Sequence, residues 1–218
     1  MVDRSHHTKD LFETFILAGG VSSRMGRPKH LLDFNGESLI GRTIHLVKPL
    51  VKKVTVVGAM VDSLPTGIRS ISDESFAVHT EPGRSKGPLT GMATALSHSQ
   101  SPWNLILACD LPYLTAGWLR WLLARAEKSQ SQVVVPKTIR GLEPLAAVYR
   151  GECAVAIRHA LLNGIRKATD VLNQFAIETV DEAEWREIGP EGLVLRNMNT
   201  PADYDEARAR FQKKNSHA

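Results

Sequence analysis

The sequence predicts an α/β protein built on one doubly wound, mostly parallel sheet with helices on both faces. Short apolar runs alternate along the chain with stretches whose apolar residues recur at helical spacing. The run 105–109 is apolar throughout, as expected for a central parallel strand covered on both faces. In such folds a ligand lies beyond the carboxyl ends of the strands.

Six short runs have the character of strands. They are apolar or β-branched, and changes of pattern around them are marked by Gly, Pro or Asp. The expected strands cover 15–17, 54–57, 77–79, 105–109, 132–135 and 144–149. The first of them enters Gly19-Gly20, which indicates a tight loop.

Six further stretches are expected to be helical. They cover 38–50, 89–98, 118–127, 154–162, 169–175 and 199–210. Pro88 lies near the first turn of the second helix, and Gly164 follows the fourth. Thr200 and Pro201 supply an N-cap and a first helical residue for the last helix. The segment 181–195 is rich in Glu and Gly, so we expect a surface excursion there.

Composition and charge favour one domain in a reducing cytoplasm. The formal net charge is +4 with dispersed basic residues, which does not indicate nucleic-acid binding. Cys109 and Cys153 each lie in an apolar run, so we expect buried thiols rather than a disulfide or zinc site. The sequence has no signal peptide and no apolar run of about 18 residues, so no membrane association is expected. We expect a flexible leader over 1–13, the domain over 14–211 and a flexible tail over 212–218.

The strongest motif is L-A-G-G-V-S-S-R-M-G-R-P-K, residues 17–29, directly after the first expected strand. Gly19 and Gly20 lack a Cβ, so their N–H groups can approach phosphate oxygens closely. Arg24 and Lys29 would neutralise a triphosphate. The motif matches neither the P-loop nor the dinucleotide fingerprint, and a glycine turn with solvated cations is the alternative.

Two other motifs point to the same chemistry. In A-C-D-L-P, residues 108–112, Asp110 follows the apolar strand, where a carboxylate can hold Mg²⁺ that also contacts phosphate. The alternative is a turn or N-cap aspartate before Pro112. In G-P-L-T-G, residues 87–91, a helix begins, and its N–H groups could meet a nucleotide.

The thirteen-residue string 17–29 resembles the signature loop of small-molecule nucleotidyltransferases, especially the molybdenum cofactor guanylyltransferases and their cytidylyltransferase relatives. The D-L-P and G-P-L-T-G motifs and the ending N-x-N-T-P at 197–201 are also similar to that family, and the resemblance runs from Phe15 to Arg208. It implies a Rossmann-like sheet of the nucleotide-diphospho-sugar transferase type over 14–211. It also implies transfer of GMP from GTP to the phosphate of Mo-molybdopterin, with Mg²⁺ as cofactor and molybdoenzyme maturation proteins as further partners.

The resemblance also implies residue roles. Asp110 would bind the metal, and Arg24 and Lys29 would act with it in catalysis. Nucleotide contacts are expected from Leu17, Ala18, Gly19, Gly20, Lys29, Glu81, Gly87, Pro88, Leu89 and Asp110. Acceptor contacts are expected from Glu143, Asn197 and Asn199.

Two positions depart from the family pattern. Glu81 stands where the family usually has an aspartate that contacts the nucleoside. Gly58 stands where some members carry an asparagine that contacts the base. Because G-P-L-T-G is more typical of the guanylyltransferases, GTP is favoured, but CTP or another phosphorylated acceptor remains an alternative. A nucleotide-binding module without catalysis is the alternative from another class.

Overall fold

The structure is a computed structural model of the 218-residue chain. It describes residues 9–19, 29–34, 36–58, 64–73, 87–188 and 192–215. The strand expected at 77–79 and the site residues Gly20, Arg24 and Glu81 lie outside the described residues. Lys29 is described through its backbone alone.

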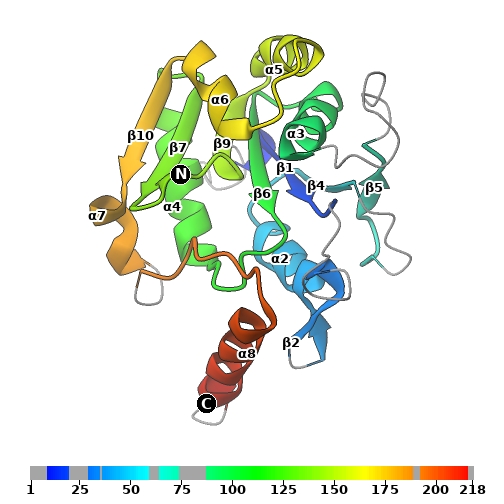
Figure 1. The fold of residues 1–218 in the computed structure, drawn as a ribbon, viewed down its shortest axis with the longest axis vertical. Coiled ribbons are helices and arrows are strands. Elements are labelled where there is room, and N and C mark those ends of the chain that lie inside the picture. Colours follow the sequence, from blue (N-terminus) through cyan, green and yellow to red (C-terminus); the bar gives the residue numbers. More distant parts are fainter. Residues whose placement is uncertain are drawn as a thin grey trace, which may run out of the picture.

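A mostly parallel sheet forms the centre of the molecule (Figure 1). Its strands are β1 (Phe12–Leu17), β4 (Lys53–Val57), β5 (Arg69–Ile71), β6 (Trp103–Ala108), β7 (Val133–Thr138), β8 (Gly141–Leu142), β9 (Ala146–Arg150) and β10 (Ile177–Asp181). The order is β10-β7-β9-β6-β1-β4-β5, with β8 paired to β7. Every pair is parallel except those that involve β8 or β9. The chain from β7 to β9 is too short for a parallel crossover, so β9 runs antiparallel.

Helices and a small hairpin surround this sheet. The helices are η1 (Lys29–Leu31), α2 (Leu39–Val47), α3 (Gly87–Ser97), α4 (Ala116–Lys128), α5 (Cys153–Leu162), α6 (Ala168–Val171), η3 (Leu172–Gln174), α7 (Glu182–Trp185), η4 (Arg186–Ile188) and α8 (Pro201–Asn215). The hairpin joins β2 (Asp33–Phe34) to β3 (Glu37–Ser38).

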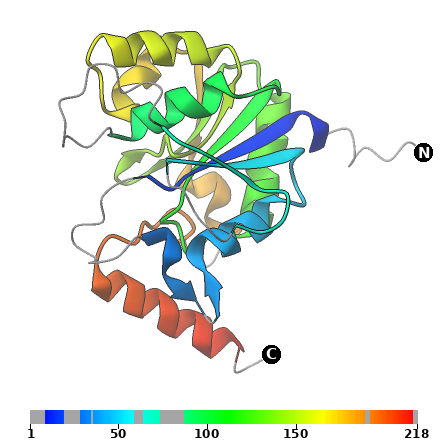
Figure 2. The ribbon, with the colours of Figure 1, turned by 90° about the vertical axis from the view of Figure 1, so that its right-hand side faces the viewer.

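Both faces of the sheet are buried, because alternate side chains of a strand point to opposite faces. Phe12 and Ile16 of β1 enter one core cluster with residues of α2 and α4. Phe15 and Leu17 enter a second cluster with residues of α3 and α5. Figure 2 shows α3 and α5 on one side of the sheet and α2 on the other. The predicted doubly wound sheet is therefore confirmed.

Side chains fix where several helices begin and end. Thr200 Oγ1 accepts a hydrogen bond from Asp203 N at 3.2 Å, and Pro201 is the first helical residue, so the predicted cap is confirmed. Thr115 Oγ1 accepts from Trp118 N in the same way at the start of α4. Gly164, after α5, has a φ of +85°, as the predicted helix end requires.

The expectation of a surface excursion over 181–195 is wrong in part: Asp181, Ala183, Glu184, Arg186 and Glu187 are exposed, but three apolar side chains are buried. α7 brings Trp185 into the core, where its ring lies edge-on to Trp118 at a centroid distance of 6.1 Å. Val194 and Leu195 are also buried. Charged and glycine residues separate these apolar side chains, so no periodic pattern revealed them.

Two chain boundaries also differ from expectation. β1 begins at Phe12, inside the range 1–13 assigned to the leader, and Phe12 pairs with Trp103 of β6. α8 continues to Asn215, inside the range 212–218 assigned to the tail. Both boundaries lie next to polar residues, which weaken the apolar pattern that indicates a strand or a helix.

Both cysteines are buried free thiols, as predicted. Burial raises the pKa of the Cys153 thiol to about 12, with a smaller contribution from Glu152. Within the described ranges, no helix is both long and apolar enough to cross a membrane.

Candidate active site

The carboxyl ends of four neighbouring strands meet at one edge of the sheet. Cys109 N donates to Leu17 O at 3.1 Å, which aligns the end of β6 with that of β1. Ala18 N donates to Val57 O at 2.9 Å, and Gly58 N donates to Ile71 O at 2.9 Å, which aligns β4 and β5. This is the edge at which parallel α/β sheets bind their ligands.

Two glycines lie against each other at this edge. Gly58 has a φ of +96°, and a Cβ placed on it would lie 2.9 Å from Gly19 Cα and 3.0 Å from Gly19 N. Any side chain at position 58 would therefore displace the start of the signature loop. This contact gives a steric reason for glycine at position 58, where the sequence departs from the pattern of the family that it resembles.

Asp73 is a site residue that the sequence analysis missed. Its Oδ2 lies 3.5 Å from the Cβ position of both Gly19 and Gly58, just past the end of β5. β5 has only three residues and lacks an apolar run, so no strand was predicted there, and the family resemblance placed the nucleoside carboxylate at Glu81. An aspartate two residues after Ile71 was the signal that could have identified it.

Asp110 lies in the turn directly after the central strand β6, and its side chain is partly exposed. The N-cap of the following helix α4 is Thr115, so Asp110 does not cap that helix, but it does lie in a turn, as the other part of the alternative interpretation states. The backbone N–H of the preceding Cys109 is bonded to Leu17 O. The carboxylate of Asp110 therefore belongs to the same edge as the glycines.

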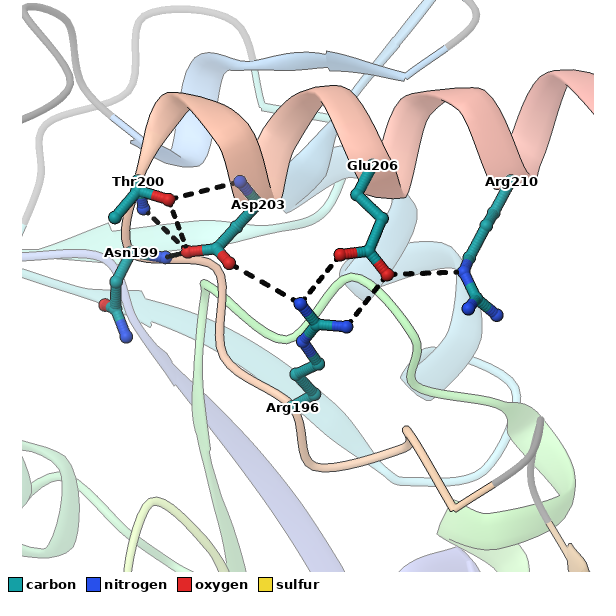
Figure 3. Close-up of polar contacts among 6 residues, drawn as sticks. All are labelled: Arg196, Asn199, Thr200, Asp203, Glu206 and Arg210. Atoms are coloured by element: carbon teal, nitrogen blue, oxygen red, sulfur yellow. Dashed lines mark hydrogen bonds and ion pairs between the residues drawn. The ribbon is translucent and has the colours of Figure 1, made fainter.

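The ending N-x-N-T-P lies beside Asp110. Met198 N donates to Asp110 O at 2.9 Å, and the Met198 side chain is buried. Asn197 Oδ1 is buried and accepts no hydrogen bond within the described part of the chain. A buried acceptor left unpaired costs free energy, which a ligand N–H group could recover. Asn199 is exposed, and its side chain points away from the capping contacts of Asp203 (Figure 3).

The Glu143 carboxylate accepts hydrogen bonds from side chains of the β7–β8 hairpin. Its Oε1 accepts from Thr138 Oγ1 at 2.8 Å and from Arg140 Nη2 at 3.0 Å. Arg140 Nη2 also donates to Leu195 O at 2.7 Å. These bonds attach the β7–β8 hairpin to the segment just before Asn197. A direct contact of Glu143 with the acceptor stays a prediction.

The glycines of G-P-L-T-G allow α3 to pack closely. A Cβ on Gly91 would lie 3.4 Å from Leu17 Cδ1 and Cδ2. Gly87 has a φ of +69°, and a Cβ there would lie 3.3 Å from Arg166 O. Leu17 and Leu89 are buried in the core, so they can meet a nucleotide through backbone atoms alone. α3 follows β5, so its N-terminus, with Pro88, begins on the side of the ligand edge.

The described residues contain no group of three or more His, Cys, Asp or Glu that could hold a metal ion. Lys29 begins η1, which leads into the buried Leu32. It is the first residue after Gly19 that the structure describes.

A doubly wound sheet with glycines and carboxylates gathered at its carboxyl edge defines a nucleotide-binding α/β protein. Residues 14–180 match the family described as the MobA-like NTP transferase domain. The chain belongs to this family of nucleotidyltransferases.

Individual relatives support this assignment. The chain is 31% identical over 194 residues to a probable molybdenum cofactor guanylyltransferase of Pelotomaculum thermopropionicum, covering 88% of this chain and 90% of that protein. In fold it is similar to molybdopterin-guanine dinucleotide biosynthesis protein A from Archaeoglobus fulgidus, with a TM-score of 0.75, 24% identity, and coverage of 92% and 99% of the two chains. It is also similar in fold to 2-C-methyl-D-erythritol 4-phosphate cytidylyltransferase from Thermus thermophilus, with a TM-score of 0.65, 15% identity, and coverage of 92% and 98%.

Proposed function

We propose that this protein transfers GMP from GTP to the phosphate of Mo-molybdopterin and releases pyrophosphate. The observation that carries the proposal is the hydrogen bond from Met198 N to Asp110 O. It joins the N-x-N segment, assigned to the acceptor, to the backbone carbonyl of Asp110, the residue whose carboxylate is assigned to the metal and the nucleotide. The name of the Pelotomaculum relative supports the same reaction.

Mg²⁺ is the proposed cofactor, and Asp110 is its proposed protein ligand. The donor set fits this ion, because Mg²⁺ is commonly held by one or two carboxylates, phosphate oxygens and several waters. When bound, it would neutralise charge on the triphosphate and on the departing pyrophosphate.

In the proposed reaction, an oxygen of the acceptor phosphate attacks the α-phosphorus of GTP. A new P–O bond forms as the bond between the α-phosphorus and the bridging oxygen breaks, and both electrons leave with pyrophosphate. A phosphate monoester is already largely ionised near pH 7, with a second pKa of about 6, so the site does not need a strong general base. The protein would contribute alignment and charge neutralisation, to which Gly19, Gly20, Arg24 and Lys29 are assigned.

The fold alone does not determine which nucleotide is used, since the similar fold from Thermus thermophilus belongs to a cytidylyltransferase. The G-P-L-T-G motif at 87–91 favours GTP. We assign a nucleoside contact to Asp73 because of its place beside Gly19 and Gly58. Glu81 keeps its proposed role as an alternative contact.

The test is product formation by the purified protein with Mo-molybdopterin, Mg²⁺ and either GTP or CTP. We expect a guanine dinucleotide product and stoichiometric pyrophosphate with GTP. Preference for CTP would contradict the base assignment and keep the reaction. Nucleotide binding without pyrophosphate from any phosphorylated acceptor would support the alternative, a non-catalytic module. The proposed setting is the cytoplasm, where molybdoenzyme maturation proteins would receive the product.

A further inference from the structure

Helix α8 packs on a cluster of its own, separate from the two core clusters of the sheet. The cluster contains Leu32, Phe34, Leu39, Tyr113, Met198, Tyr204 and Ala207, with Leu193 and Phe211 at its margin. Figures 1 and 2 both show α8 alongside the β2–β3 hairpin, away from the main sheet. Three of these side chains lie within or shortly after the site motifs: Leu32 three residues after the motif 17–29, Tyr113 directly after D-L-P, and Met198 within N-x-N-T-P.

The apolar face of α8 contacts residues that follow the motif 17–29. Tyr204 Oη donates to Asp33 O at 2.8 Å. Its ring lies edge-on to Phe34 at a centroid distance of 5.4 Å. Asp33 and Phe34 form β2, which follows the η1 turn that begins at Lys29. The helix therefore fixes the backbone of residues 33 and 34, which follow the motif 17–29.

Charged side chains of α8 also contact the segment 196–200, whose Asn197 and Asn199 are assigned to the acceptor, and the first contact is at Arg196 (Figure 3). Arg196, the residue before Asn197, donates from both terminal nitrogens to Glu206, at 2.8 and 2.7 Å. Such a two-bond contact between guanidinium and carboxylate restricts orientation as well as distance.

Another charged side chain of α8 contacts the end of this segment. Asp203 Oδ2 accepts from Asn199 N at 3.0 Å, from Thr200 N at 2.9 Å and from Thr200 Oγ1 at 2.8 Å. Asn197 and Asn199 therefore lie between two attachments to one helix.

We propose that α8 is the positioning element of the site: Tyr204 holds residues 33 and 34, which follow the motif assigned to the nucleotide, and Glu206 holds Arg196, which precedes the asparagines assigned to the acceptor. The proposal rests on the proposed function for the identity of the two substrates. The role proposed for each residue is indirect. Each acts by holding backbone whose neighbours are assigned to a substrate, and pre-organised groups of this kind determine how well reacting atoms align.

Kinetics separates the two roles. In Glu206→Gln, loss of the charged two-bond contact should raise the KM for the acceptor about fivefold to tenfold and leave the KM for GTP unchanged. In Tyr204→Phe, loss of the hydroxyl should raise the KM for GTP and leave the KM for the acceptor unchanged. Arg210→Gln is the matched control, because Arg210 contacts Glu206 at 3.5 Å but not Arg196 in the contacts described. It should leave both KM values unchanged.

Amide hydrogen exchange tests the proposal without turnover. Glu206→Gln should speed exchange at residues 197–199, and Tyr204→Phe should speed it at residues 32–34, while β1 and β6 keep their protection. Equal changes in both KM values, or faster exchange confined to α8, would overturn the positioning role. If the wild-type protein transfers no nucleotide, the proposed function fails, and the exchange pattern still decides whether α8 holds both segments.

Discussion

Gly58 adopts a backbone conformation that residues with side chains rarely take, and it does so against the backbone of Gly19. Asp73 and Asp110 follow the ends of β5 and β6 at the same edge. At the residue scale, the site thus combines a close backbone approach with two carboxylates. The positions of Gly19 and Asp110 at this edge could be predicted because each directly follows an apolar run. Asp73 was not predicted, because its place depends on a short edge strand without an apolar run.

Gly58→Ala tests the contact between the two glycines. The positive φ alone costs about 1–2 kcal/mol for a residue with a side chain, and the clash with Gly19 adds to that cost. We expect a destabilisation above about 2 kcal/mol by denaturant unfolding, together with a raised KM for the nucleotide.

The matched control is Gly67→Ala, because Gly67 has a φ of +84° and no atom within 4 Å of its Cβ position. Gly67→Ala should show only the loss of unfolding free energy that comes from the positive φ, and it should keep the wild-type KM. If the two variants behave alike, the contact between Gly58 and Gly19 does not shape the site.

At the scale of elements, α8 depends on the reciprocal cap between Thr200 and Asp203. The N–H of Asn199, followed by the Thr200 hydroxyl, lowers the pKa of Asp203 below its ordinary value. The charged cap thus contributes stability above the ordinary Asp pKa of about 3.9, and this contribution is lost as the pH falls through the lower, folded-state pKa.

Thr200→Ala should cost about 1 kcal/mol of unfolding free energy at pH 7. Asp203→Asn should also destabilise the protein at pH 7, and its difference from the wild type should shrink as the pH falls below about 4. Denaturant unfolding at several pH values measures both effects. A difference that stays constant with pH would mean that the charge of Asp203 does not stabilise the cap.

α7 shows what local patterns cannot predict about elements. The helix has only four residues, two glutamates and one alanine followed by one tryptophan, so neither its length nor an apolar period indicates a helix. Trp185 nevertheless lies fully buried against Trp118. β8 and β10 were missed for a similar reason, since one has two residues and the other is half exposed.

Trp185→Ala should destabilise the protein by about 3–5 kcal/mol, because it leaves a cavity against Trp118. Trp121→Ala is the comparison, because Trp121 packs only partly buried against the same cluster. Its cost should be clearly smaller in thermal or denaturant unfolding. Equal costs would contradict the placement of α7 in the core.

At the scale of the whole molecule, two core clusters enclose the sheet and a third joins α8 to its ligand edge. The doubly wound sheet could be predicted because the alternation of strands and helices is regular. The third cluster could not, because its members are spread from Leu32 to Phe211 and meet only after folding. The segments proposed to contact the nucleotide and the acceptor therefore come from opposite ends of the chain to one edge.

The most direct test of this account is pyrophosphate release by Asp110→Ala with GTP, Mo-molybdopterin and saturating Mg²⁺. Asp205→Ala, which removes an exposed carboxylate of α8, is the control. We predict that Asp110→Ala keeps its circular dichroism and melting temperature but loses at least about 10²-fold in kcat, whereas the control keeps full activity. Retained turnover with an unchanged Mg²⁺ requirement in Asp110→Ala would contradict the account.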